Sequence, residues 1–302
     1  MSNLLVTGGA GFIGSHLTRE LLARGHQVRV LDSLIYGLRD WVDPRAEFIE
    51  GDIRDPETCH RAMVGIEGVF HAAAMSRSGP SLDNIDACTQ ANIVGTQNVL
   101  IAARDAGVRR LVYSGYSTFY GSQPPPHREY ETPSDFLNFY GLSKHVGEEY
   151  CLMFDKAFDL PVVVLRYFNV YGPRQPQVGA YALVLGIFLR RWLDGETLII
   201  HGDVQQRRDF IHVRDVVRAN IMALESDRRA EIFNVGSGTN VSVQELADMI
   251  SDRQEPGPRR EGDAKVTLAD ISRIKAALGW APLTPFTEGV EELKRLMRAG
   301  ED

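Results

Sequence analysis

The chain has 302 residues, of which 44% are hydrophobic and 24% are charged, an ordinary composition for a globular protein with one large and one smaller domain. The formal net charge is −7 at pH 7, so nonspecific binding to nucleic acid is not expected. An anionic ligand would have to be met by locally placed arginines.

The three cysteines, Cys59, Cys88 and Cys151, are far apart and form no C-x-x-C pattern. They indicate neither a zinc site nor a disulfide framework, so we expect no metal and a reducing, cytoplasmic environment. The opening residues MSNLLVTGG lack a basic region followed by an apolar stretch, and we therefore expect no signal peptide. No apolar run approaches the length of a bilayer span, so a membrane is not an expected partner.

Short β-rich runs alternate with helical patterns from the start of the chain. The predicted strands are Leu4–Val6, Val28–Leu31, Glu47–Ile49, Val69–Phe70, Arg110–Tyr113 and Val162–Leu165, and the predicted helices are Phe12–Ala23, Asn92–Ala106 and about Asn138–Phe158. This βαβα order predicts an α/β fold, a doubly wound parallel sheet covered by helices on both faces. After Tyr171-Gly172-Pro173 the elements become shorter and richer in Gly and Pro, which indicates a second, smaller domain.

A glycine-rich turn, Thr7-Gly8-Gly9-Ala10-Gly11-Phe12-Ile13-Gly14, follows the first strand and opens the first helix. Gly8, Gly11 and Gly14 permit a tight turn that brings backbone N–H groups close to a pyrophosphate at the helix N-terminus. Asp32 ends the next strand, where a carboxylate binds ribose hydroxyls and repels a 2′-phosphate, which favours NAD over NADP. The alternative is a glycine turn without a ligand. A P-loop is excluded because no Lys-Ser/Thr follows the last glycine.

Tyr140 and Lys144 lie four residues apart on one face of a predicted helix, and no other tyrosine is followed by lysine at this spacing. Alone, the pair would indicate a solvated helix contact, but after a dinucleotide turn it predicts a catalytic base. A phenol has a pKa of about 10, so a base near pH 7 needs a shift worth roughly 4 kcal/mol. A cation about 4 Å away, at an effective dielectric constant near 20, supplies roughly that much. Lys144 and an oxidised nicotinamide are both cations.

At these motifs the chain resembles the extended short-chain dehydrogenase/reductases, specifically the nucleotide-sugar epimerases and dehydratases. The resemblance covers nearly the whole chain and rests on TGGAGFIG, GDIRD (51–55), HAAA (71–74), NIVGTQN (92–98), YGLSK (140–144), LRYFNVYGPR (165–174), RDF (208–210) and RREGD (259–263). It implies a Rossmann NAD-binding domain of residues 1–170 plus about 209–235. A smaller nucleotide-sugar-binding domain would contain residues from about 171–208 plus 236–302.

The resemblance also implies roles for individual residues. NAD would contact Gly8, Gly11, Phe12, Ile13, Gly14, Asp32, Ser33, Asp52, Ile53, Ala73, Ala74, Ser114, Tyr140, Lys144 and Tyr167. The substrate would contact Ser117, Asn169, Arg174, Arg208, Arg260, Asp263 and Thr267. Arg208 and Arg260 would bind the two phosphates, as arginine forks suit a diphosphate, although each arginine alone also fits a surface ion pair. Thr267 would wall the sugar pocket, and its small size implies tolerance of UDP-N-acetylhexosamines or UDP-hexuronates.

The hydroxyl-rich stretch YSGYSTFYG, residues 113–121, bears on the reaction. Family dehydratases and decarboxylases carry an acidic residue where this chain has Ser117 and Thr118, and neither hydroxyl is a general base without an activating partner. We therefore predict an NAD-dependent epimerase of a UDP-sugar at C4, acting through a transient 4-keto intermediate and bound NADH. The alternatives are a dehydratase, reductase or other epimerase of a dTDP-, GDP- or CDP-sugar, and a catalytically impaired NAD-binding protein.

The same stretch departs from the family pattern at Tyr116. The family keeps Ser or Thr four residues before the tyrosine of the Tyr120-Gly121 pair, where it assists Tyr140. Three explanations stay open: Tyr116 replaces that hydroxyl from a shifted loop, Ser117 or Thr118 replaces it, or catalysis is impaired. The predicted catalytic residues are accordingly Tyr140, Lys144, Tyr116 and Thr118. The resemblance further implies a homodimer through the helices containing about Asn92–Ala106 and Asn138–Phe158.

Overall fold

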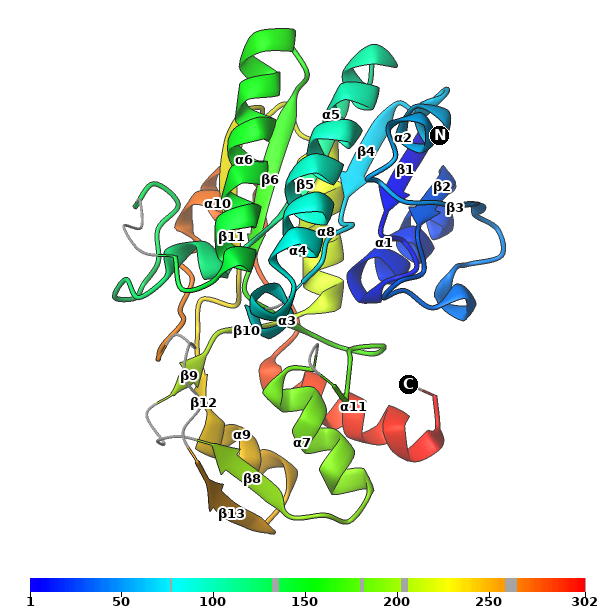
Figure 1. The fold of residues 1–302 in the computed structure, drawn as a ribbon. Helices are drawn as coiled ribbons and strands as arrows, with labels where there is room; N and C mark the ends of the chain where they lie inside the picture. Colours follow the sequence, from blue (N-terminus) through cyan, green and yellow to red (C-terminus); the bar gives the residue numbers. More distant parts are fainter. Residues whose placement is uncertain (77, 132–135, 180–181, 202–205, 259–264, 302) are drawn as a thin grey trace.

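The computed structural model describes residues 1–76, 78–131, 136–179, 182–201, 206–258 and 265–301. Its centre is a seven-stranded parallel sheet in the order β11-β6-β5-β4-β1-β2-β3 (Figure 1). The strands are β1 (Asn3–Thr7), β2 (Gln27–Asp32), β3 (Glu47–Glu50), β4 (Gly68–His71), β5 (Arg110–Tyr116), β6 (Val162–Tyr167) and β11 (Glu231–Val235). The chain reverses its direction of winding between β1 and β4, so the predicted doubly wound sheet is confirmed.

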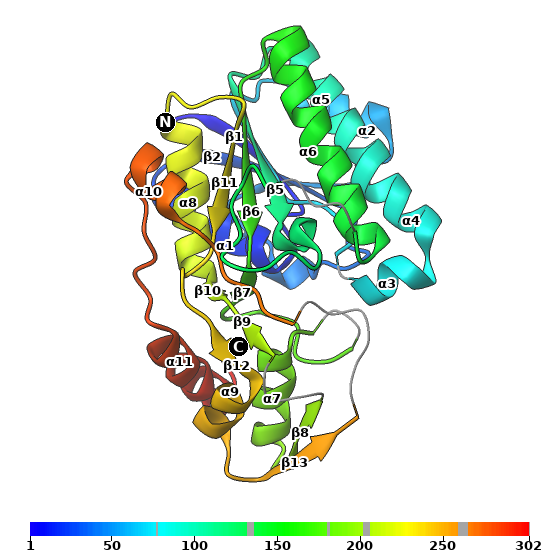
Figure 2. The same cartoon turned by 90° about the vertical axis from the view of Figure 1, so that its left-hand side faces the viewer.

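Helices cover both faces of this sheet (Figure 2). On one face lie α1 (Phe12–Ala23), α8 (Val213–Glu225) and α10 (Ser272–Leu278), and on the other lie α2 (Pro56–Met63), α5 (Gly95–Asp105) and α6 (Phe139–Phe158). Successive strand residues point to opposite faces: Leu4 and Val6 pack with α1 and α8, whereas Leu5 packs with α2 and α5. Both faces are buried, which explains the continuous apolar runs in the strands.

Two predicted elements differ from the observed ones. Strand β5 runs to Tyr116 rather than to Tyr113, because Ser114, Gly115 and Tyr116 continue the pairing with β6. The predicted helix Asn92–Ala106 is divided between a π-helical turn, η2 (Gln90–Val94), and α5, which starts after that turn. Two short helices, α3 (Ser78–Asp83) and α4 (Ile85–Thr89), precede η2. Extra residues in a helical turn are frequent beside functional sites.

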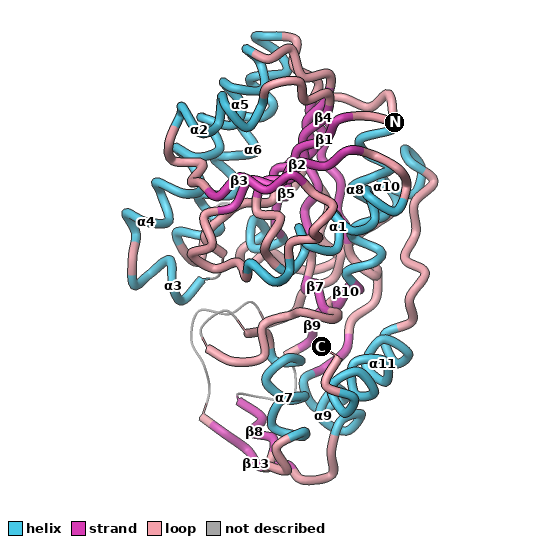
Figure 3. Tube along the Cα trace, turned by 90° about the vertical axis from the view of Figure 1, so that its right-hand side faces the viewer, coloured by secondary structure: helices cyan, strands magenta, loops and turns pink. Residues whose placement is uncertain are grey.

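A smaller group of elements lies beyond the carboxyl ends of the strands (Figure 3). It contains α7 (Val184–Leu193), β8 (Leu198–His201), α9 (Val243–Ile250), β13 (Gln254–Gly257) and α11 (Phe286–Ala299). Residues of α7, β8, α9 and α11 form a separate hydrophobic core. Two short pairs connect it to the large sheet: β7 (Asn169–Tyr171) with β10 (Phe210–His212), and β9 (Arg207–Arg208) with β12 (Val241–Ser242). Single-turn 3-10 helices are η1 (Arg39–Trp41) and η3 (Ser117–Tyr120).

We propose the two-domain division expected from the sequence, with one adjustment at the carboxyl end. Ile274 of α10 and the nearby Trp280 belong to the core of the large sheet, so the chain returns to the first domain before α11. In the described ranges, no helix has the length and apolar character needed to cross a membrane. The same ranges contain no group of three or more His, Cys, Asp or Glu residues that is arranged to hold a metal ion.

Candidate active site

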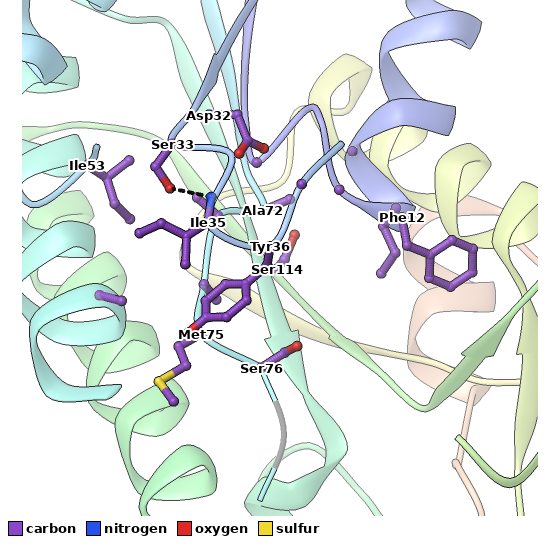
Figure 4. A pocket seen from close by; sticks show the side chains of 18 of the residues that line it. Phe12, Asp32, Ser33, Ile35, Tyr36, Ile53, Ala72, Met75, Ser76 and Ser114 are labelled. Atoms are coloured by element: carbon purple, nitrogen blue, oxygen red, sulfur yellow. Dashed lines mark hydrogen bonds between the residues drawn. The ribbon is translucent and has the colours of Figure 1, made fainter. Parts of the chain in front are cut away.

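A cavity of about 530 Å³ lies at the carboxyl ends of the central strands, where parallel sheets of this kind bind ligands. Every residue expected to contact NAD lines this cavity, although contact with NAD itself is a proposal. Figure 4 shows Ser33, Ile35 and Tyr36 from the loop after β2 facing the same space as Met75 from the loop after β4. The cavity thus collects residues from most of the length of the large domain.

The glycine turn packs too closely for side chains to fit. A Cβ at Gly8, where φ is +74°, would lie 2.7 Å from the backbone nitrogen of Ala73, and a Cβ at Gly14 would overlap the Gly8 carbonyl oxygen. The backbone of the turn is therefore open to close approach by a ligand. Gly11 caps α1 without a side-chain hydrogen bond, which leaves the positive end of this helix for an anion. These features fit the pyrophosphate of a dinucleotide.

Asp32 connects the glycine turn to the following loop. One carboxylate oxygen accepts from the Ala10 N–H at 3.0 Å, and the other accepts from the Leu34 N–H at 2.9 Å. Burial raises the pKa of this carboxyl, and the two hydrogen bonds oppose the rise. Asp32 therefore presents a fixed carboxylate at the cavity wall, where ribose hydroxyls are expected.

A buried chain of hydrogen bonds fixes the loop after β4. The hydroxyl of Thr96 donates to the Asn92 carbonyl at 2.7 Å, so it accepts from Nε2–H of His71 at 3.0 Å. Nδ1 of His71 then accepts from the Thr7 hydroxyl at 2.7 Å, and that hydroxyl accepts from the Ala73 N–H at 3.2 Å. Burial lowers the pKa of His71 to about 3, so this histidine stays neutral and serves as a spacer.

Asn92 joins the same loop to helix α6. Its Oδ1 accepts from the Met75 N–H at 2.8 Å, and its Nδ2 donates to the Met75 carbonyl at 2.9 Å. The same Nδ2 also donates to the hydroxyl of Ser143 at 2.9 Å, and Ser143 lies between Tyr140 and Lys144. The cavity wall and the helix that carries the predicted base are therefore held in register by one side chain.

Lys144 is only 3% exposed, and its Nζ lies 4.1 Å from the centre of the Tyr113 ring. The ring face replaces part of the lost hydration of the ammonium. Burial lowers the pKa of Lys144 to about 8, so the side chain is still mostly protonated near pH 7. Tyr140 lies one helical turn earlier and lines the cavity with it. A cation beside the phenol stabilises the phenolate, which is the form needed in a base.

Tyr167 is not suited to act as the base. Its hydroxyl donates to Oδ1 of Asn220 at 2.9 Å and accepts from the Ser114 hydroxyl at 3.1 Å. Burial raises the pKa of Tyr167 to about 12. Tyr167 and Ser114 therefore form a fixed, neutral part of the cavity wall.

Of the hydroxyls in residues 116–118, only that of Tyr116 belongs to a cavity-lining residue. The Tyr116 and Tyr140 rings lie 5.4 Å apart between centroids, tilted by 50°. Ser117 is buried and does not line the cavity. Thr118 does not line it either, yet its Oγ1 is buried without a hydrogen-bond partner in the part of the chain that the structure describes. Tyr116, Ser117 and Thr118 thus all stay candidates for the assisting hydroxyl, and Tyr116 is the one on the cavity wall.

The described residues among those expected to bind the substrate do not line this cavity. The Thr267 hydroxyl accepts from Asn169 Nδ2 at 3.3 Å and from the Asp209 N–H at 3.1 Å, so these three are brought together. The Asp209 carboxylate accepts from the Ser237 and Ala269 N–H groups, and burial raises its pKa to about 6. Asp209 is therefore the structural centre of this side of the site.

The two described arginines that are expected to bind the substrate, Arg208 and Arg174, occupy separate places. Arg208 donates to the carbonyl of Lys265 at 3.1 Å, and Lys265 follows the segment 259–264 in the sequence. Arg260 and Asp263 belong to that segment and lie outside the described residues. Arg174, where φ is +67°, donates to the Trp41 carbonyl at 3.2 Å, and its guanidinium lies 5.7 Å from the centre of the Trp41 ring. Arg174 thus connects the loop after β7 to the loop after β2.

Sequence reasoning missed several residues of the cavity wall. They are Ile35, Tyr36, Leu38, Trp41, Met75, Ser76, Gln177 and Val178. Ile35, Tyr36 and Leu38 are each more than half exposed, which is unusual for large apolar side chains next to each other. The concentration of apolar residues in SLIYGLRDW, directly after Asp32, was the available signal.

Comparisons with known proteins agree with this architecture. Residues 4–236 match the family described as the NAD dependent epimerase/dehydratase family. The chain belongs to this family. It is 37% identical to a putative UDP-glucose 4-epimerase of Methanocaldococcus jannaschii, with 98% of each chain covered. It superposes with a TM-score of 0.95 and 35% identity on UDP-glucose 4-epimerase of Thermotoga maritima with UDP-glucose, covering 99% and 100% of the chains. It also superposes on a Thermus thermophilus UDP-glucose 4-epimerase in complex with NAD, with a TM-score of 0.90 and 34% identity. That superposition covers 98% of this chain and 99% of the other.

The position of Asp32 predicts cofactor selectivity. Asp32→Ala removes the ribose acceptor and the repulsion of a 2′-phosphate, so we expect NAD affinity to fall more than NADP affinity. Asp32→Asn also removes the charge but keeps the size of the side chain, and its single amide oxygen can accept only one of the two bonds from the Ala10 and Leu34 N–H groups. Calorimetric titration measures both affinities. Equal affinity of the wild type for the two cofactors would show that Asp32 does not select between them.

Burial of Lys144 predicts a pH-dependent cost in stability. Because the folded pKa, about 8, lies below the ordinary value of 10.5, the penalty is fully present below pH 8 and is relieved as the pH rises towards 10.5. Lys144→Met should therefore raise the free energy of unfolding of the cofactor-free protein by up to about 3 kcal/mol at pH 7, and by less at pH 10. Urea titrations measure this, with Lys156→Met, an exposed lysine of the same helix, as control. If Lys144→Met and the wild type differ in free energy of unfolding by the same amount at pH 7 and at pH 10, the lowered pKa of Lys144 is contradicted.

The contact between Tyr116 and Tyr140 predicts that variants lacking different hydroxyls of the site differ in turnover. Tyr140→Phe should nearly abolish turnover while NAD stays bound, because the base is lost. If Tyr116 relays the proton, Tyr116→Phe should lower kcat by at least about tenfold, since general acid–base help is typically worth 10²–10⁴-fold. Steady-state kinetics of Tyr116→Phe, Ser117→Ala and Thr118→Val identify the working hydroxyl. Full activity of Tyr116→Phe, together with a crippled Thr118→Val or Ser117→Ala, would make Tyr116 a wall residue only.

Proposed function

We propose that this protein is an NAD-dependent epimerase that inverts C4 of a UDP-sugar through a transient 4-keto sugar. The observation that carries the proposal is the placement of Tyr140 and the buried Lys144 on the wall of a cavity whose glycine turn fits a dinucleotide. Family membership and the two 4-epimerases of known structure described above support the same reaction class.

In this proposal, Tyr140 does the proton chemistry. As a phenolate it takes the proton from the C4 hydroxyl of the sugar, and it returns that proton when the new configuration forms. Lys144 stabilises the phenolate electrostatically and stays protonated. NAD, when bound, would accept hydrogen with its electron pair from C4 and give it back to the other face of the keto sugar. Tyr116 would hold the sugar oxygen beside Tyr140.

The small number of acidic side chains on the described cavity wall favours epimerisation over dehydration or decarboxylation. Among the described lining residues the carboxylates are Asp32 and Asp52. Asp32 is hydrogen-bonded to the glycine turn, and Asp52 forms an ion pair with Arg54 at 2.6 Å. Elimination of water from a keto sugar requires a further proton transfer, and Ser117 and Thr118 supply no base for it.

Arg208, Arg260, Asp263, Asn169 and Thr267 are proposed to bind the nucleotide sugar. The bond from Arg208 to the carbonyl of Lys265, two residues after Asp263 in the sequence, supports this proposal. UDP is proposed as the nucleotide because the similar proteins described above bear UDP-sugar names. Arg174, which contacts Trp41, is proposed to act on the substrate only through the loop that it holds.

A homodimer and a cytoplasmic location complete the proposal. The outer face of α6 carries an apolar stripe, in which Leu142 is 40% and Met153 is 57% exposed. Leu82 and Ile85, at the ends of α3 and α4, are exposed in the same region. Such a surface suits a second copy of the chain. The three cysteines are free and buried, which is compatible with a reducing compartment.

Incubation with a panel of nucleotide sugars tests the function. We expect UDP-glucose and UDP-galactose to interconvert, and UDP-N-acetylglucosamine to be converted as well if Thr267 leaves room at C2. Nuclear magnetic resonance of the products distinguishes a C4 epimer from a 4-keto-6-deoxy sugar, with Tyr140→Phe as the inactive control. A dehydrated product would replace the epimerase proposal by its dehydratase alternative. Bound NAD without turnover of any UDP-, dTDP-, GDP- or CDP-sugar would indicate an impaired cofactor-binding protein.

A further inference from the structure

Three chemically active side chains follow each other at helical spacing on α6: Tyr140, Lys144 and Glu148. Lys144 and Glu148 are both buried, with 3% and 0% of their surfaces exposed. Opposite charges four residues apart on a helix attract each other. Glu148 is thus placed to bind the ammonium of Lys144 and to cancel the charge that stabilises a Tyr140 phenolate.

Arg166 of β6 binds Glu148 instead. Its Nη2 and Nε donate to Oε2 of Glu148 at 2.8 and 3.0 Å, and Nε also reaches Oε1 at 3.2 Å. Both partners of this ion pair are almost fully buried. Gly115 of β5 makes room for it, because a Cβ at that position would lie 2.7 Å from Oε1 of Glu148.

The other end of the Arg166 guanidinium holds the hydroxyl-rich turn. Its Nη1 donates to the Tyr120 hydroxyl at 3.2 Å and to the Glu129 carbonyl at 3.0 Å. Its Cζ lies 3.5 Å from the centre of the Phe119 ring. Phe119 and Tyr120 belong to η3, which begins directly after Tyr116. One guanidinium therefore links the helix that carries Tyr140 to the turn that follows Tyr116.

We propose that Arg166 and Glu148 are positioning residues for the Tyr140–Lys144 pair. Arg166 neutralises Glu148, so that the charge of Lys144 acts on Tyr140, and it fixes η3 relative to α6. The proposal rests on the proposed function only in taking Tyr140 as the base. Neither Arg166 nor Glu148 lines the cavity, so neither is assigned to contact a ligand.

The other groups that face Lys144 do not take over the role of Glu148. They are His71 on β4, Tyr113 on β5, Cys88 on α4, and Tyr140 and Cys151 on α6 itself. Burial raises the pKa values of Tyr113 and Cys151 and lowers that of His71, so these three are neutral near pH 7. Among these groups and Glu148, only Glu148 carries a carboxylate that could bind the ammonium of Lys144. On the side of Arg166, burial raises the pKa values of Glu129 and Tyr120.

The test is an ultraviolet titration of the Tyr140 phenol in the purified holoprotein, taken as the difference from Tyr140→Phe. Arg166→Met leaves Glu148 to bind Lys144, so the Tyr140 pKa should rise by about one unit or more. Glu148→Gln leaves Arg166 as a second cation, so the Tyr140 pKa should fall. Arg166→Met combined with Glu148→Met removes both charges and should return the value to that of the wild type. The acid limb of the kcat profile should move in the same order.

Opposite shifts in the two single variants are the signature of the electrostatic role. Shifts of the same sign, or no shift with activity losses that follow the melting temperature, would overturn the proposal. If Arg166→Met does not fold, the test compares Glu148→Gln with Arg166→Lys. Glu148→Gln should lower the Tyr140 pKa, whereas Arg166→Lys keeps the charge and should leave the Tyr140 pKa unchanged. Because the titration needs no substrate, it gives a result even if UDP-sugars are not turned over, and failure of the epimerase assay is thereby separated from failure of this inference.

Discussion

A protonated lysine buried between helix α6 and the inner strand β5 is the constraint on which the rest of the site depends. An ammonium without hydration is unstable in a protein interior unless other groups compensate for the lost water. Here the Tyr113 ring faces Lys144 at 4.1 Å. Gly147 allows this packing, because a Cβ there would overlap the Tyr113 hydroxyl. Helix α6 must therefore lie close against β5. Because Tyr140 is on the same helix, this packing also sets the position of Tyr140 relative to the sheet.

The ionisable groups around Lys144 are either neutral or paired with an opposite charge. His71 is kept neutral by burial and joined on both ring nitrogens, so it adds no second positive charge beside Lys144. Glu148 is held by Arg166, so this carboxylate is not free to neutralise the ammonium. Active sites commonly carry such arrangements at a cost in stability, and the lowered pKa of Lys144 is the local sign of that cost.

Much of the fold and the central part of the site follow from local sequence patterns. The glycine turn, the individual strands and the Tyr140–Lys144 pair are each encoded within a few consecutive residues, and local patterns report such features directly. The end of β5 was missed because its last residues resemble a loop, and only pairing with β6 makes them a strand. The roles of Asn92 and Trp41 were not predicted, because they arise from contacts with Met75, Ser143 and Arg174, far away in the chain. Likewise, no local pattern reveals that Asp209 holds together segments near residues 169, 237 and 267.

If Tyr140 and the cofactor site together invert C4, the same hydrogen must leave C4 and return to it. Deuterium in UDP-glucose labelled at C4 can be followed through turnover by the wild-type protein. We expect UDP-galactose that retains the label at C4, with none released to solvent, because the hydrogen leaves and returns within one enclosed site. Deuterium found at C6, or washed out into water, would exclude this mechanism, since the first outcome marks dehydration and the second marks proton exchange at C4.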